Sequence, residues 1–123
     1  MHYTFKHAQD YLRAELFGRQ TVEETQQFVA ALVAEARKLA AARILIWVRN
    51  SRPIFKVEPH RLAEQFRSLA GHKALRVALL ADSEEVRASH QYLEVLAGQQ
   101  GAPLRAFRDE TRALAWLRAQ SQE

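Results

Sequence analysis

Cysteine is absent from this chain, and glycine and proline are scarce, with four glycines and three prolines among 123 residues. Without cysteine there is no disulfide, no thiolate zinc site and no cysteine nucleophile. A thiol-free chain is also compatible with a reducing compartment. The four glycines fall at the expected ends of helices and strands, which excludes a glycine-rich phosphate loop; they are Gly18, Gly71, Gly98 and Gly101.

Long apolar segments are also missing. No apolar run approaches the roughly 20 residues that a membrane-spanning helix needs. Residues 1–7 alternate between polar and apolar, unlike the continuous apolar core of a secretory signal. We therefore expect a cytoplasmic protein without a membrane span. A chain of 123 residues suits one domain, residues 1–123, which can bury enough surface to fold without a metal or a disulfide.

Charge of one sign is not concentrated anywhere. The chain has 18 Lys and Arg against 14 Asp and Glu, a net charge of +4. The arginines are interspersed with carboxylates, as in Arg13 near Glu15 and Arg112 near Asp109. Because nucleic-acid binding favours a basic stripe, this pattern indicates a mixed-charge surface and disfavours a nucleic-acid partner.

The spacing of apolar residues predicts alternating strands and helices. Residues 3–7 and 12–16 alternate in polarity, which is typical of an antiparallel hairpin. Thr21 and Glu24 then form a capping box before a helix of about five turns. The runs Ile44–Val48 and Val77–Leu80 are apolar at both parities, as in parallel strands covered on both faces.

Three more helices and a last strand complete the pattern. Pro59 opens a helix that reaches Leu69, Asp82 with Glu85 caps the next helix, and Asp109 caps the last. A short strand covers residues 104–107. The order β-β-α-β-α-β-α-β-α predicts an α/β fold, with a mixed, mostly parallel sheet of five strands and four helices.

Three segments carry a resemblance to a known family. They are the hairpin leading into Thr21-Val22-Glu23-Glu24, the strand Arg43–Val48, and the ending Arg105–Asp109 followed by Ala113–Leu117. With these pieces in this order, nearly the whole chain resembles the STAS domain family, the anti-sigma-factor antagonist-like (SpoIIAA-like) fold, and is similar to bacterial members of uncharacterised role.

The resemblance implies a non-enzymatic regulatory or protein-interaction module with a protein partner. A second copy of the chain is one candidate partner, giving a homodimer through the hairpin edge or an apolar helix face. Antagonist members of the family are switched by phosphorylation of a serine or threonine after the third strand, which corresponds here to Ser51. Those members usually have an aspartate just before that residue, where this chain has Asn50, so the sequence argues against carrying the switch over.

Sheet topology gives an independent prediction of a site. Ligands of open parallel sheets lie beyond the carboxyl ends of the strands, where loops and helix N-termini meet. Arginines and hydroxyls in these loops suit a phosphate or carboxylate. The candidate ligand-binding residues are Arg49, Ser51, Arg52, Ser83 and Arg108. The alternative function is thus a carrier or sensor of a small anionic ligand, such as a nucleotide, a phosphorylated metabolite or a lipid headgroup.

Catalytic and metal-binding patterns are not recognisable in the sequence. His2 and His7 point to opposite faces of one strand, and the other histidines lie on different elements without a second ligand at metal spacing. The titratable groups also lack the close pairings of acid–base or nucleophilic catalysis. We therefore expect no catalytic residue, metal or cofactor. Trp47 is expected in the core, whereas Trp116 either covers the sheet or anchors a partner.

Overall fold

The computed structural model describes residues 1–8, 10–53, 75–99 and 103–119. The strands are β1 (His2–His7), β2 (Leu12–Phe17), β3 (Arg43–Arg49), β4 (Arg76–Ala81) and β5 (Leu104–Ala106). The helices are α1 (Val22–Leu39), α3 (Glu84–Gln99) and α4 (Glu110–Arg118). The helix predicted from Pro59 to Leu69 lies outside the described residues.

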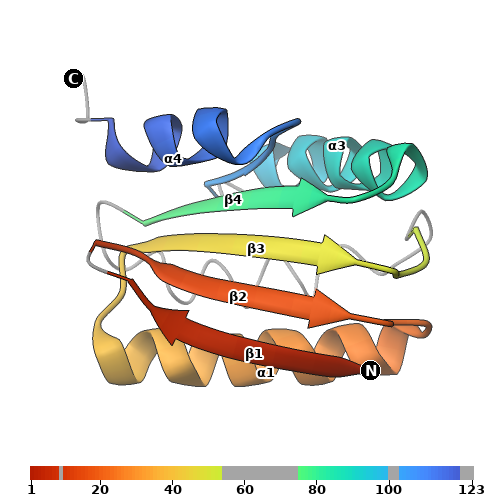
Figure 1. Cartoon of the computed structure of the whole chain (residues 1–123), viewed down its shortest axis with the longest axis horizontal. Coiled ribbons are helices and arrows are strands. Elements are labelled where there is room, and N and C mark those ends of the chain that lie inside the picture. Colours follow the sequence, from red (N-terminus) through yellow and green to blue (C-terminus); the bar gives the residue numbers. More distant parts are fainter. Residues whose placement is uncertain (9, 54–74, 100–102, 120–123) are drawn as a thin grey trace.

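All five strands form one sheet in the order β1-β2-β3-β4-β5 (Figure 1). β1 and β2 are the predicted antiparallel hairpin, and the remaining neighbours pair in parallel, with Leu12 opposite Ile44 and Ile44 opposite Val77. The predicted mixed, mostly parallel sheet is therefore confirmed. The arrowheads of β2, β3 and β4 point to the same side in Figure 1, so the loops that follow them meet at one edge.

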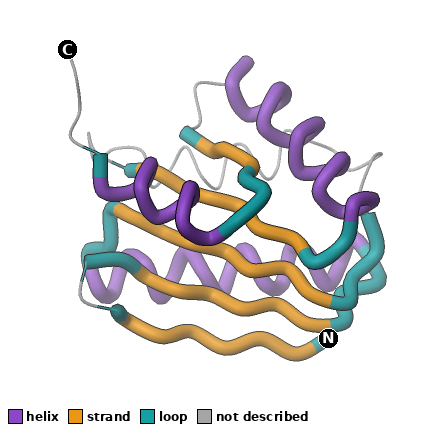
Figure 2. The backbone as a smooth tube through the Cα atoms, turned by 45° about the horizontal axis from the view of Figure 1, so that its top comes forward, coloured by secondary structure: helices purple, strands orange, loops and turns teal. Residues whose placement is uncertain are grey.

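The placement of the helices follows from this strand order. Each new parallel strand is added beside the preceding one, and right-handed crossovers then put the connecting helices on one face. α1 and α3 accordingly share a face and a common core. α4 comes after the last strand and lies on the opposite face, with α1 behind the sheet in Figure 2.

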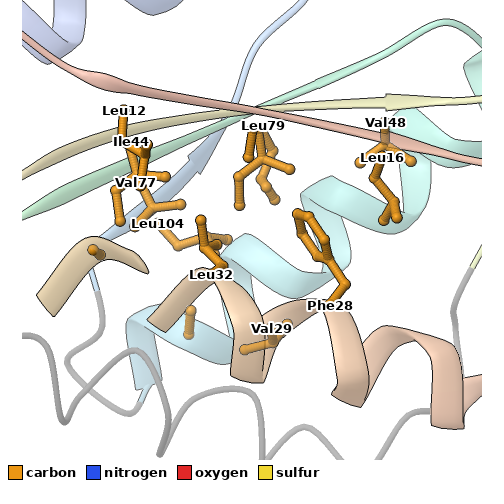
Figure 3. Packing of buried hydrophobic residues seen from close by; sticks show 14 of the residues in the cluster. Leu12, Leu16, Phe28, Val29, Leu32, Ile44, Val48, Val77, Leu79 and Leu104 are labelled. Atoms are coloured by element: carbon orange, nitrogen blue, oxygen red, sulfur yellow. The ribbon is translucent and has the colours of Figure 1, made fainter. Parts of the chain in front are cut away.

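The larger core lies between the sheet and the pair α1 and α3 (Figure 3). Phe28 and Leu32 of α1 point at the sheet because they lie one turn apart on the same side of the helix. Each fully buried leucine or phenylalanine stabilises the fold by roughly 1.5–3 kcal/mol. The side chains they meet from the strands include Leu12, Leu16, Ile44, Val48, Val77, Leu79 and Leu104.

The opposite core is smaller and depends on α4. Ala113 and Leu117 are fully buried against the sheet residues Leu45, Ala78 and Leu80. Trp47 and Trp116 are only partly buried at its margin. The ring of Trp116 lies 5.5 Å from that of Phe107, so Trp116 helps to cover the sheet.

Arginines from the sheet hold the end of α4. The Arg43 Nε donates to the Leu117 carbonyl at 2.8 Å, and Arg76 donates to the Trp116 carbonyl. Cations at the C-terminal end of a helix also interact favourably with its dipole.

None of the helices in the described ranges is long and apolar enough to cross a membrane.

Two of the three predicted helix caps within the described residues are confirmed. Thr21 and Glu24 form the expected capping box, and the Asp109 carboxylate accepts the Arg112 N–H at 2.8 Å. The cap predicted at Asp82 is wrong. β4 runs to Ala81, so Asp82 lies one residue too early, and the Ser83 hydroxyl accepts the Val86 N–H at 3.2 Å instead.

Candidate functional site at the carboxyl ends of the strands

Three loops meet beyond the carboxyl ends of β2, β3 and β4. Together they line an open pocket of about 350 Å³. We call its lining residues the strand-end surface; they are Gln20, Asn50, Ser51, Arg52, Asp82 and Ser83. Arg52 and Asp82 are both exposed, so the surface carries charges of both signs.

Backbone conformation and hydrogen bonds fix these loops to one another. Gly18 has φ +68°, a left-handed conformation that glycine adopts without steric cost, and its N–H donates to the Arg49 carbonyl at 3.1 Å. Asn50 is also left-handed, at φ 49°, as asparagine tolerates. Its N–H donates to the Asp82 carboxylate at 3.0 Å, which joins the loops after β3 and β4.

Ser51 joins the first two loops. Its hydroxyl donates to the Arg49 carbonyl at 2.9 Å and accepts the Arg19 N–H at 3.1 Å. The Arg52 N–H in turn donates to the Arg19 carbonyl at 3.0 Å. The Ser51 hydroxyl therefore has a structural task, and a phosphoryl group on its oxygen would displace at least the donated bond.

A buried arginine lies directly beneath this surface. Arg19 is only 4% exposed, and its guanidinium donates to the Arg52 carbonyl. Burial lowers its pKa to about 10. Among the described residues no carboxylate lies within ion-pair distance of Arg19. Sequence reasoning missed this buried arginine, since an arginine after a strand-ending glycine is ordinarily solvated.

His90 of α3 is buried in the same region. It is 3% exposed, and burial together with the charges of Arg19 and Arg87 lowers its pKa to about 3. The imidazole is therefore neutral at physiological pH. Its Nδ1 has no hydrogen-bond partner within the described part of the chain. A neutral, enclosed imidazole contributes to the fold by packing.

The structure brings together only three of the five predicted ligand-binding residues. Ser51, Arg52 and Ser83 share the strand-end pocket. Arg49 lies on the face of the sheet, with its guanidinium 4.5 Å from the centre of the Trp47 ring and 3.8 Å from the Glu15 carboxylate. Arg108 lines a separate pocket beside α3 and α4.

A polar network that the sequence did not indicate ties α4 to the sheet. Glu110 accepts hydrogen bonds from the Trp47 Nε1 at 2.9 Å and the Arg13 Nη1 at 3.1 Å. The bond from Trp47, and then the Arg13 guanidinium, lower the pKa of the Glu110 carboxyl. Arg13 also pairs with Glu15 at 2.8 Å. The network orients the first turn of α4 over β2 and β3.

The polar side chains of the strand-end surface are largely engaged within the protein. Among its described lining residues the one carboxylate, that of Asp82, accepts a backbone N–H, and the Ser51 hydroxyl both donates and accepts a hydrogen bond. Within the described ranges no three His, Asp or Glu residues cluster as metal ligands would. The exposed side chains of Arg52 and Asp82 can still contact a binding partner.

Comparison with known proteins identifies the fold. No protein-family model matches the chain, and no curated protein matches it in sequence. Among solved structures, that of the anti-sigma factor antagonist SpoIIAA in its unphosphorylated form is similar, with a TM-score of 0.61 and 16% sequence identity. The match covers 98% of this chain and 100% of that one. The chain therefore has the STAS-type, SpoIIAA-like fold that its element order predicted.

Proposed function

We propose that this chain is a regulatory module that acts by binding another protein and catalyses no reaction. The observation that carries the proposal is the fold, which over almost the whole chain is similar to that of a protein described as an antagonist of an anti-sigma factor. By that description the similar protein acts on a protein. The proposal also retains the predicted cytoplasmic location.

The strand-end surface is the proposed contact area. Hydrogen bonds between Gly18 and Arg49, Asn50 and Asp82, and Ser51 and Arg19 fix its three loops before any partner arrives. A preorganised surface loses little conformational entropy on binding. Exposed charges of both signs suit a mixed-charge protein surface, and complementary charges would set the orientation of the partner.

A small anion is less well matched to this surface. Among its described lining residues Arg52 is the one arginine, Asp82 offsets that charge, and Arg49 lies elsewhere. In this proposal Ser51 is one of the residues that form the contact area. Its phosphorylation stays a prediction that the two hydrogen bonds of its hydroxyl disfavour.

Site-specific photo-crosslinking tests the proposal. A benzophenone amino acid replaces Arg52 at the strand-end surface and, as the matched control, Ala34 on the exposed side of α1. In an extract of the cells that make the protein, we expect a discrete protein adduct from position 52 and none from position 34. An excess of unmodified chain should suppress the adduct, and the Arg52→Glu chain should not.

Each outcome bears on the proposal. An adduct of twice the chain mass would identify a second copy as the partner, and a heavier or lighter adduct would identify another protein. Equal labelling from both positions, or no adduct from position 52, would contradict the proposed surface.

A further inference from the structure

A second pocket, separate from the strand-end surface, is lined mainly by arginine. It has a volume of about 300 Å³ and lies between α3, the end of β5 and the start of α4. Four guanidinium groups contribute to it from three segments of the chain. Its lining residues are Arg87, Gln91, Arg105, Ala106, Phe107, Arg108 and Arg112.

The carboxylates near this pocket only partly offset its charge. Arg87 pairs with Glu84, and Arg112 lies 3.5 Å from Asp109 in a pair that is mostly exposed to solvent. Exposed pairs of this kind contribute little and are easily exchanged for another anion. Glu94 lies near the pocket as well, where it accepts the Ala106 N–H at 2.8 Å.

Two of the arginines have no carboxylate partner among the residues that the structure describes. In the described part of the chain no ion pair forms at Arg105 or Arg108, and both residues are exposed. The Arg105 guanidinium lies 5.6 Å from the centre of the Phe107 ring, which positions it beside the pocket wall. Arginine that is held on an aromatic face loses less rotamer entropy when it binds an anion.

Two contacts hold Arg87 in the wall of the pocket. The side chain of Arg87 is 16% exposed, its Nη2 donates to the Ala81 carbonyl at 3.4 Å, and its guanidinium pairs with Glu84. α4 begins beside Arg108, but the Asp109 carboxylate caps its first turn, so the positive potential of the pocket comes from the arginine side chains. A volume of about 300 Å³ is at the small end of the range for ligand sites.

We propose that this pocket binds the phosphate group of a small phosphorylated molecule. The planar guanidinium groups of Arg105 and Arg108 would each offer paired N–H donors to phosphate oxygens, as arginine does in phosphate recognition. Arg87 and Arg112 would supply further charge around a dianion. This inference goes beyond the proposed protein-binding function and uses none of the residues of the strand-end surface.

Titration calorimetry with adenosine monophosphate and pyrophosphate tests this site. Adenosine provides a ligand without phosphate, and sodium sulfate at equal ionic strength provides a non-specific anion. We expect both phosphate compounds to bind the wild-type chain, with adenosine giving no signal and sulfate competing weakly. The double variant Arg105→Gln/Arg108→Gln should bind about tenfold more weakly or worse, because it loses two charge-assisted interactions.

The matched control is Arg52→Gln, which removes one arginine charge from the other pocket and should bind phosphate like the wild type. Equal binding of adenosine and adenosine monophosphate would overturn the proposal, because the phosphate would then contribute nothing. Loss of binding in Arg52→Gln with retention in the double variant would overturn it as well, by placing the anion at the strand-end surface. No binding at 10 mM of either phosphate compound would also refute it.

Polymeric RNA distinguishes a macromolecular ligand from a small one. Binding of RNA with a steep salt dependence, and without binding of the two phosphate compounds, would overturn the proposal in favour of a nucleic-acid surface. None of these outcomes depends on the photo-crosslink at position 52, so the two proposals stand or fall separately.

Discussion

Lowering the pH from 7 to 5.5 tests the burial of His90. Its pKa in the folded chain is about 3, below the ordinary value of 6.5. Between these two values the unfolded chain takes up a proton at this histidine, whereas the folded chain does not. A histidine whose pKa is lowered by folding therefore contributes stability that is complete above pH 6.5 and is lost as the pH falls.

The expected loss follows from the difference between the two pKa values. Protonation of the unfolded state lowers the free energy of unfolding by about 0.2 kcal/mol at pH 7 and by about 1.4 kcal/mol at pH 5.5. The difference is about 1 kcal/mol. The carboxyls of Asp10, Glu24 and Glu110 also have lowered pKa values, but their ordinary values are 3.8–4.5. Their contribution is therefore lost mainly below this pH window.

Urea unfolding at the two pH values measures the effect. His90→Gln is compared with the wild-type chain, and His7→Gln, at an exposed position of β1, is the matched control. The wild type and His7→Gln should each lose about 1 kcal/mol more than His90→Gln between pH 7 and 5.5. The remaining histidines are present in every variant, so their effects cancel in the comparison.

The reasoning would be refuted if His90→Gln lost as much stability as the wild type over this window. Arg19→Met adds a second test. The charge of Arg19 is one cause of the lowered pKa of His90, so its removal should raise that pKa, which NMR titration of the His90 imidazole in the folded chain measures. An unchanged His90 pKa in Arg19→Met would show that the charge of Arg19 does not act on His90.

Three further substitutions test other contacts. Ala40→Gly should raise the free energy of unfolding by about 0.5–1 kcal/mol in urea titrations, because Ala40 ends α1 in a left-handed conformation, with φ 53°. Trp47→Phe should lower the free energy of unfolding by about 1–3 kcal/mol through loss of the hydrogen bond to Glu110. Because the two residues interact, the double variant Trp47→Phe/Glu110→Gln should lose less stability than the sum of the two single variants. Leu117→Ala should lower the free energy of unfolding by about 2–5 kcal/mol and with it the midpoint of thermal unfolding, since Leu117 is fully buried between α4 and the sheet.

The fold was predictable because each of its signals is local. Alternation of polarity predicted the hairpin, helical spacing after Thr21 predicted α1, and apolar residues at both parities predicted β3 and β4 as interior strands. The rule that ligands gather at strand ends led to Ser51, Arg52 and Ser83; these three line one pocket, and their binding of a ligand stays a prediction. Topology was sufficient for these three because they follow the strands directly.

The misplacement of Arg49 and the wrong cap at Asp82 have a common cause, which is a strand end shifted by one residue. β3 continues to Arg49, so this side chain lies on the same face as Trp47, two residues earlier. β4 continues to Ala81, which moves the helix cap from Asp82 to Ser83. A one-residue shift changes the face of a strand residue, and apolar patterning does not define strand ends that closely.

The surroundings of Arg19 and His90 were beyond sequence reasoning for a different reason. Arg19 comes from the loop after β2 and His90 from α3, segments far apart in the chain, and in the fold the charge of Arg19 acts on His90. Neither residue has neighbours in the sequence that distinguish it from an exposed arginine or histidine. The arginine pocket is similar, because Arg87 reaches it from α3 while Arg105 and Arg108 come from the end of β5.

The order of the strands has a consequence for biosynthesis. Every strand pairs with the one that precedes it in the chain, so the sheet can grow in step with translation. α1 and α3 both precede β5 and can cover their face of the sheet as it forms. Leu45 and Leu80, on the other face, stay uncovered until α4 has left the ribosome. The newly made chain thus passes through a stage in which one face of the sheet is covered by helices and the other still exposes its apolar side chains. Chaperones would bind to that exposed apolar face.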